Sequence, residues 1–110
     1  MSDTFDVPMG PREWDYTCKF GGGKVKAHLR QLTTEEEDGC IDFSDRGRVR
    51  IDKAKYVRLG CMSLTGLTVS GEAVTDGAGV CSTRGLLALL GELFVAVQAG
   101  SDLAEEERKN

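Results

Sequence analysis

Two stretches near the start of the chain alternate between apolar and polar residues. From Glu13 to Phe20 every second residue is aromatic or apolar, and a similar alternation returns from Lys24 to Arg30. A period of two places successive side chains on opposite faces of a β-strand. Gly21 to Gly23 lie between the runs, and glycine adopts positive φ easily. The pattern predicts an antiparallel hairpin with one buried face.

A short helix is predicted directly after this hairpin. Thr33, followed three residues later by Glu36, has the sequence of a capping box. We expect the helix to run from about Thr34 to Ile41. The four acidic residues 35–38 also resemble a metal-binding run. Because consecutive helical positions point in different directions, they cannot converge on one ion, and we expect no metal there.

The next segment is less regular. Residues 44–47 are typical of a turn. Asp52 suits the N-cap of a second helix over residues 53–59. Because Val49 and Ile51 alternate with arginines, a strand in this region stays open as the alternative.

Strand-forming residues return over 62–69, and Ser70-Gly71 predicts a second two-residue hairpin. We expect a loop over residues 76–79. From Ser82 to Gly100, apolar residues then recur at helical spacing over most of the circumference, which predicts one long helix.

This helix has more apolar surface than a small sheet can cover. Its polar positions are Arg84, Glu92 and Gln98. A helix that is apolar on most sides is either packed centrally or shared with a partner, and we expect a contact with a second subunit or another protein. The interface residues expected on this helix and on the basic segment before it are Leu87, Leu89, Leu90, Phe94, Arg48 and Arg50.

The elements combine into an α+β fold. We expect an antiparallel sheet built from two hairpins, packed by a long C-terminal helix and one or two short helices. The 110 residues suit a single domain over 13–110, preceded by an extended or loose lead-in over 1–12. A last short helix is predicted over residues 103–109.

The charge balance argues against nucleic acid as a partner. The net charge is −4, whereas nucleic-acid binding depends on Lys and Arg that neutralise phosphates. Residues 46–58 carry six Lys or Arg against this average. We interpret them as a solvated face, with a docking patch for an acidic partner as the alternative.

The chain shows no catalytic or cofactor motif. Its four cysteines are spread without a CxxC pair, and His28 is the single histidine, so we expect free thiols, no metal and no cofactor. An enzyme would need Cys61 or Cys81 as nucleophile with His28 as base, and no spacing supports that pairing. We therefore expect no enzyme and no small-molecule substrate.

We expect no membrane segment. The longest near-apolar stretch, from Gly85 to Gly100, contains Glu92 and glycine and is shorter than the roughly 20 residues that a spanning helix needs. With no signal peptide visible, we expect a cytoplasmic protein.

Several phrases resemble small proteins encoded among the tail genes of tailed bacteriophages and prophages. They are the capping phrase of residues 32–37, the stretch Gly66 to Glu72 (GLTVSGE), the Leu- and Phe-rich helix, and the ending of residues 103–110 (LAEEERKN). The chain departs from these proteins at Leu64, near a place where many of them have tryptophan.

The resemblance implies a non-enzymatic tail-assembly factor or minor structural protein. Its partners would be phage tail proteins or further copies of itself, in the bacterial cytoplasm during assembly or in the virion. The alternative is a small cytoplasmic module that binds a ligand or peptide, with a groove lined by Trp14, Tyr16 and Phe94.

Overall fold

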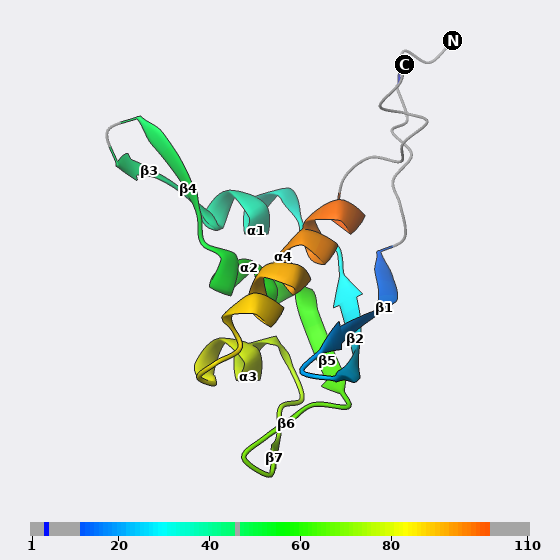
Figure 1. The fold of residues 1–110 in the computed structure, drawn as a ribbon. Coiled ribbons are helices and arrows are strands. Elements are labelled where there is room, and N and C mark those ends of the chain that lie inside the picture. Colours follow the sequence, from blue (N-terminus) through cyan, green and yellow to red (C-terminus); the bar gives the residue numbers. More distant parts are fainter. Residues whose placement is uncertain (1–3, 5–11, 46, 102–110) are drawn as a thin grey trace.

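The fold of this chain is α+β (Figure 1). The computed structural model describes residues 4, 12–45 and 47–101, so the predicted helix over 103–109 and most of the lead-in lie outside the described residues. The elements are β1 (Glu13–Phe20), β2 (Gly23–Arg30), α1 (Thr34–Gly39), β3 (Ile41–Asp45), β4 (Arg48–Ile51), α2 (Lys53–Gly60), β5 (Cys61–Thr65), β6 (Thr68–Val69), β7 (Glu72–Ala73), α3 (Gly77–Ser82) and α4 (Leu87–Ser101).

The first hairpin is confirmed and forms the main sheet together with β5. β1 pairs antiparallel with β2, and β5 adds to the other edge of β2, which gives the strand order β1-β2-β5. Gly21 and Gly22 make the turn with φ of 61° and 85°. The alternation seen in the sequence places Cys18, Val25 and Leu29 on the buried face.

The second hairpin is also confirmed, as a small separate ribbon of β6 and β7. Ser70 and Gly71 both have positive φ, 52° and 82°, as a primed two-residue turn requires. Gly66, with φ of 87°, separates this ribbon from β5. A Cβ at Gly66 would lie 2.7 Å from the carbonyl oxygen of Lys24, so the close approach of the chain to β2 also depends on this glycine.

The two short helices have the caps that the sequence predicts. The Thr33 hydroxyl accepts a hydrogen bond from the Glu36 backbone N–H at 3.2 Å, and the Glu36 carboxylate accepts one from the Thr33 N–H at 3.0 Å. Asp52 caps α2 by accepting from the Lys55 N–H at 3.0 Å. α1 ends at Gly39, earlier than predicted, because Ile41 already belongs to β3.

The start of the long helix and the loop before it were predicted wrongly. Residues 77–82 form α3, which Asp76 caps by accepting from the Gly79 N–H at 2.8 Å. α4 begins only at Leu87, because Gly85 has a φ of 87° and breaks the helical path. Thr83 therefore follows α3, where its hydroxyl donates to the Gly79 carbonyl at 2.7 Å, and does not cap α4.

The core lies between the sheet and the helices, with α4 at its centre. Leu89, Leu93 and Val97 are fully buried on the inner side of α4. On another side, Phe94 meets Tyr56 of α2 edge-on, with ring centroids 5.0 Å apart. Gly60 permits α2 and α4 to approach closely, since a Cβ there would lie 2.5 Å from a methyl carbon of Val97.

We expect Gly60→Ala to destabilise the protein by about 1–3 kcal/mol, because the added methyl group overpacks the α2–α4 contact. The measurement is urea unfolding. Gly39→Ala is the matched control: it also lies at the end of a helix, and an added Cβ there meets only the end of the flexible Lys55 side chain, at 3.4 Å, so stability should change by less than about 0.5 kcal/mol. Equal stability of the two variants would contradict this account of the packing.

Candidate functional site

The β3–β4 ribbon, here called the arm, projects from the body of the molecule beyond α1 and α2 (Figure 1). Ile41 pairs with Ile51 and Asp42 with Arg50, and the register shifts before Asp45 and Arg48. The sequence analysis predicted the turn of this hairpin but did not predict the two strands as a pair. The signal was present, because apolar residues alternate on both sides of residues 44–47.

One face of the arm is apolar and open to solvent. Ile41 and Phe43 alternate in β3, and Val49 and Ile51 alternate in β4, so the four side chains share a face, here called the apolar face of the arm. Phe43 is 63% exposed, Val49 59% and Ile51 40%. Because a two-stranded ribbon is only marginally stable alone in water, this face is suited to packing against another surface.

The expected interface residues Arg48 and Arg50 lie in β4 and are exposed. Arg50 stands opposite Asp42 in the ribbon. Two further basic residues of the segment serve the fold: the Lys55 ammonium donates to the Gly39 carbonyl at 2.9 Å, and that of Lys53 lies 5.6 Å from the Phe94 ring centroid. Among the described basic residues, these two are therefore engaged within the chain.

The expected interface on α4 needs correction. Leu87 is 79% exposed, whereas Leu90 is partly buried. Leu89 is 0% exposed and Phe94 6%, so neither side chain can reach a partner. The reason is that α2 and the sheet cover two sides of α4. The exposed side includes Val95, 61% exposed, which the sequence analysis missed.

The outer face of the main sheet carries a histidine between two carboxylates. Antiparallel pairing places His28 opposite Asp15, and its Nδ1 lies 2.8 Å from an Asp15 carboxylate oxygen. Its Nε2 lies 2.8 Å from a Glu13 oxygen. The sequence analysis did not identify these two carboxylates, although antiparallel pairing of the predicted hairpin places Asp15 directly opposite His28.

Both carboxylates favour the imidazolium, in which each ring nitrogen donates a hydrogen bond. Asp15 first and Glu13 second therefore raise the pKa of His28 above its usual value. Ring nitrogens held in this way are not available to activate a nucleophile. The cluster is an exposed ion-pair network on the sheet surface.

We expect NMR titration to find the pKa of His28 above the usual value of about 6.5. The two ion pairs of His28 contribute fully to the stability of the fold below about pH 6.5. This contribution is lost as the pH rises through the raised pKa of His28. A Glu13→Gln/Asp15→Asn double variant should return the pKa to the usual range, and Glu72→Gln, far from the cluster in sequence, should not change it. An unshifted pKa in the parent protein would contradict the arrangement.

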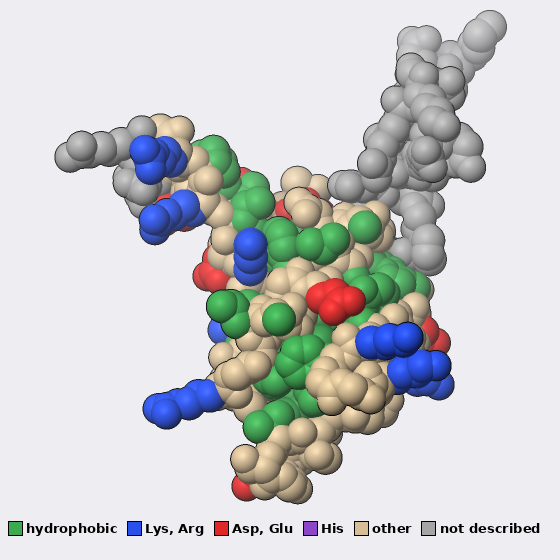
Figure 2. Space-filling view, in the orientation of Figure 1, with side chains coloured by type: hydrophobic (Ala, Val, Ile, Leu, Met, Phe, Trp, Pro, Cys, Tyr) green, Lys and Arg blue, Asp and Glu red, His purple; other side chains and the backbone are tan. Residues whose placement is uncertain are grey.

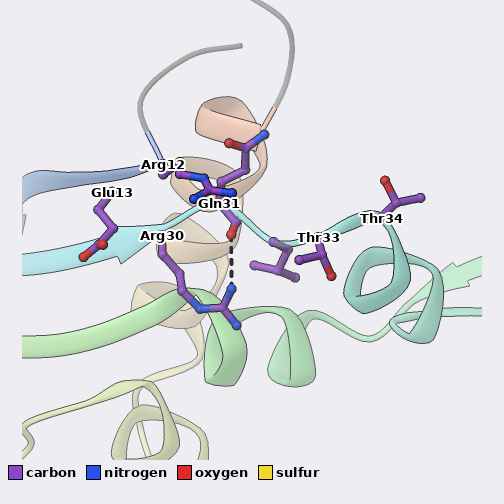
Figure 3. A pocket seen from close by; sticks show the side chains of 7 residues that line it. Arg12, Glu13, Arg30, Gln31, Thr33 and Thr34 are labelled. Atoms are coloured by element: carbon purple, nitrogen blue, oxygen red, sulfur yellow. Dashed lines mark hydrogen bonds between the residues drawn. The ribbon is translucent and has the colours of Figure 1, made fainter.

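An open pocket of about 480 Å³ lies where the end of β2 meets α1 (Figure 3). Arg30 is already engaged there: its guanidinium donates to both oxygens of Glu36 and, at 3.1 Å, to the Gln31 carbonyl. The hydrogen bonds from Arg30, and after them the one from the Thr33 backbone, lower the pKa of Glu36 to about 2. The residues that line the pocket are Arg12, Glu13, Arg30, Gln31, Leu32, Thr33 and Thr34.

The aromatic groove of the alternative hypothesis does not form. Phe94 is buried against Tyr56, and the Tyr16 hydroxyl donates to Glu92 of α4 at 3.0 Å. The Trp14 ring packs so closely on α4 that a Cβ at Gly100 would overlap it. These rings fix the sheet to α4 and leave no groove between them.

The four cysteines are free thiols, of which Cys18, Cys40 and Cys61 are buried and Cys81 partly buried. Burial raises the pKa of each thiol, that of Cys61 to about 11. Cys61 faces the core opposite Leu29, whereas His28 stands on the outer face of the sheet. The Cys–His pair that an enzyme would need is therefore not assembled from these two residues.

We expect all four cysteines to react slowly with a thiol reagent at neutral pH, because their raised pKa values leave little thiolate. Unfolding in denaturant should make all four react rapidly. The measurement is the labelling rate followed by mass spectrometry, with the unfolded chain as control. One thiol that reacts rapidly in the folded protein would instead indicate an activated cysteine.

Within the part of the chain that the structure describes, no three or more His, Cys, Asp or Glu residues are arranged to hold a metal ion. No helix in the same residues is long and apolar enough to cross a membrane.

Comparisons with known proteins do not assign the chain to a family. No protein-family model, no curated protein and no solved structure matches it.

Proposed function

We propose that this protein is a non-enzymatic component of phage or prophage tail assembly, or a minor structural protein of the tail, and that it acts through protein–protein contacts. The observation that carries the proposal is the apolar face of the arm. A projecting ribbon whose large apolar side chains are exposed is suited to packing against the surface of a partner protein.

Burial of this face would contribute substantially to binding. Phe43, Val49 and Ile51 are 40–63% exposed, so covering each would contribute about 1–2 kcal/mol before the cost of association. β3 and β4 form a two-stranded sheet, and a partner strand can add to a ribbon of this kind. Arg48, exposed at the start of β4, favours a partner with acidic residues beside its apolar surface.

The phage assignment depends on the resemblance of the phrases in residues 32–37, 66–72 and 103–110 to small tail-gene proteins. On this basis the partners are tail proteins, met in the bacterial cytoplasm during assembly, and the virion is a second location. The alternative, a small ligand- or peptide-binding module, has less support. The open pocket contains an arginine that is already paired, and the aromatic rings are packed in the fold.

We expect a Phe43→Ser/Val49→Lys double variant to lose co-purification with tail proteins encoded by neighbouring genes, because the partner would lose its apolar contact. The measurement is affinity purification after co-expression, with circular dichroism to verify the fold. Met62→Lys is the matched control, because Met62 is also an exposed apolar residue, at 48%, but lies in β5. Unchanged co-purification of the arm variant, or no tail protein bound to the parent, would contradict the proposal.

A further inference from the structure

Lysine side chains gather on the outer face of the main sheet, at the end where β1 turns into β2. Figure 2 shows a group of basic side chains at the right of the molecule, beside the β1–β2 hairpin of Figure 1. Lys19 stands directly opposite Lys24, and Lys26 lies two residues further along β2 on the same face. All three are exposed, and together they are here called the lysine surface.

The lysine surface is electrostatically unfavourable within the chain. Like charges directly opposite each other in antiparallel strands destabilise a sheet, and Lys19 and Lys24 are such a pair. Among the residues that the structure describes, none of the three lysines forms an ion pair or a side-chain hydrogen bond. The repulsion between them is therefore not offset by the fold itself, and an anionic group from outside the chain would relieve it.

A hollow of about 300 Å³ adjoins the lysine surface on the outer face of the sheet. Lys26 stands at its rim in one row between Thr17 of β1 and Thr65 of β5. Asp15 is the carboxylate among the lining residues, and its oxygen already lies 2.8 Å from Nδ1 of His28. Ammonium and hydroxyl groups donate hydrogen bonds, so the hollow is suited to an anionic oxygen group.

We propose that the lysine surface binds an extended acidic segment of a partner protein, with one carboxylate of that segment in the hollow beside Lys26. Alternate residues of an extended chain are about 6.8 Å apart and point to the same side. Lys24 and Lys26 have this same spacing, because they are alternate residues of β2. Acidic residues at every second position of the segment therefore each meet an ammonium group.

The partner is an acidic protein segment and not a nucleic acid, because the lysine surface is short. Further along β1, the same face of the sheet carries the carboxylates of Asp15 and Glu13 on either side of His28. A continuous phosphate backbone would run on to these carboxylates and be repelled, whereas a short acidic segment can end beside Lys26. The net charge of −4 also disfavours nucleic acid.

This contact goes beyond the one made by the arm and does not depend on the phage assignment. In Figure 1 the arm and the β1–β2 hairpin lie on opposite sides of the molecule, so both surfaces can be occupied at once. Loss of the arm contact leaves the lysine surface unchanged, and the reverse also holds.

The first test is an NMR titration of the full chain at low salt with a peptide of about eight residues, in which glutamates alternate with threonines. We expect shift changes in β1, β2 and β5 around the hollow, and at least about 10-fold weaker binding when glutamine replaces glutamate. A single-stranded oligonucleotide of the same charge is the third probe. No binding of the glutamate peptide, shift changes confined to another surface, or tighter binding of the oligonucleotide would overturn the proposal.

The second test separates binding from stability. Lys24→Glu places a carboxylate opposite Lys19, so it should raise the urea midpoint of unfolding and yet weaken binding of the glutamate peptide at least about 10-fold. Arg84→Glu is the matched control, because it makes the same charge change at an exposed residue between α3 and α4, and it should change binding less than about 3-fold. A lower midpoint or unweakened binding in Lys24→Glu, or equal weakening by Arg84→Glu, would overturn the proposal.

Discussion

The close contact between α2 and α4 at Gly60 and Val97 is the constraint on which the rest of the structure depends. It places α4 against both the sheet and α2, so that two sides of the helix are covered by its own chain. Phe94 and Tyr56 extend the same contact. Because α2 is fixed there, its N-cap at Asp52 also fixes where β4 ends and where the arm leaves the body.

This packing divides the apolar residues of the chain into those that stabilise the fold and those that remain exposed. The small core is filled by the sheet, α2, α3 and the inner sides of α4. The apolar face of the arm and, on α4, the side chains of Leu87 and Val95 are left in water, where exposed apolar surface is unfavourable. Of these, the apolar face of the arm is the surface that carries the proposed contact with a partner.

The polar side chains of the described residues are engaged mainly within the fold. His28 is held by Asp15 and Glu13, and Arg30 by Glu36, so the strongest polar clusters in the described residues are ion pairs on or near the surface of the fold. The thiols have raised pKa values because they are buried. Surface ion pairs of this kind contribute modestly to stability.

The sequence by itself determined the local elements: the alternating hairpin, the capping box at Thr33, the cap at Asp52 and the turn at Ser70-Gly71. These depend on contacts between residues close in the chain. Tertiary structure alone decided which side of α4 is exposed, so that Val95 and not Leu89 faces solvent. Which side of α4 is exposed depends on where α2 packs against it, and α2 is far from α4 in the sequence. The helical repeat of 3.6 residues shows which residues share a side of α4, but it does not show which side α2 covers.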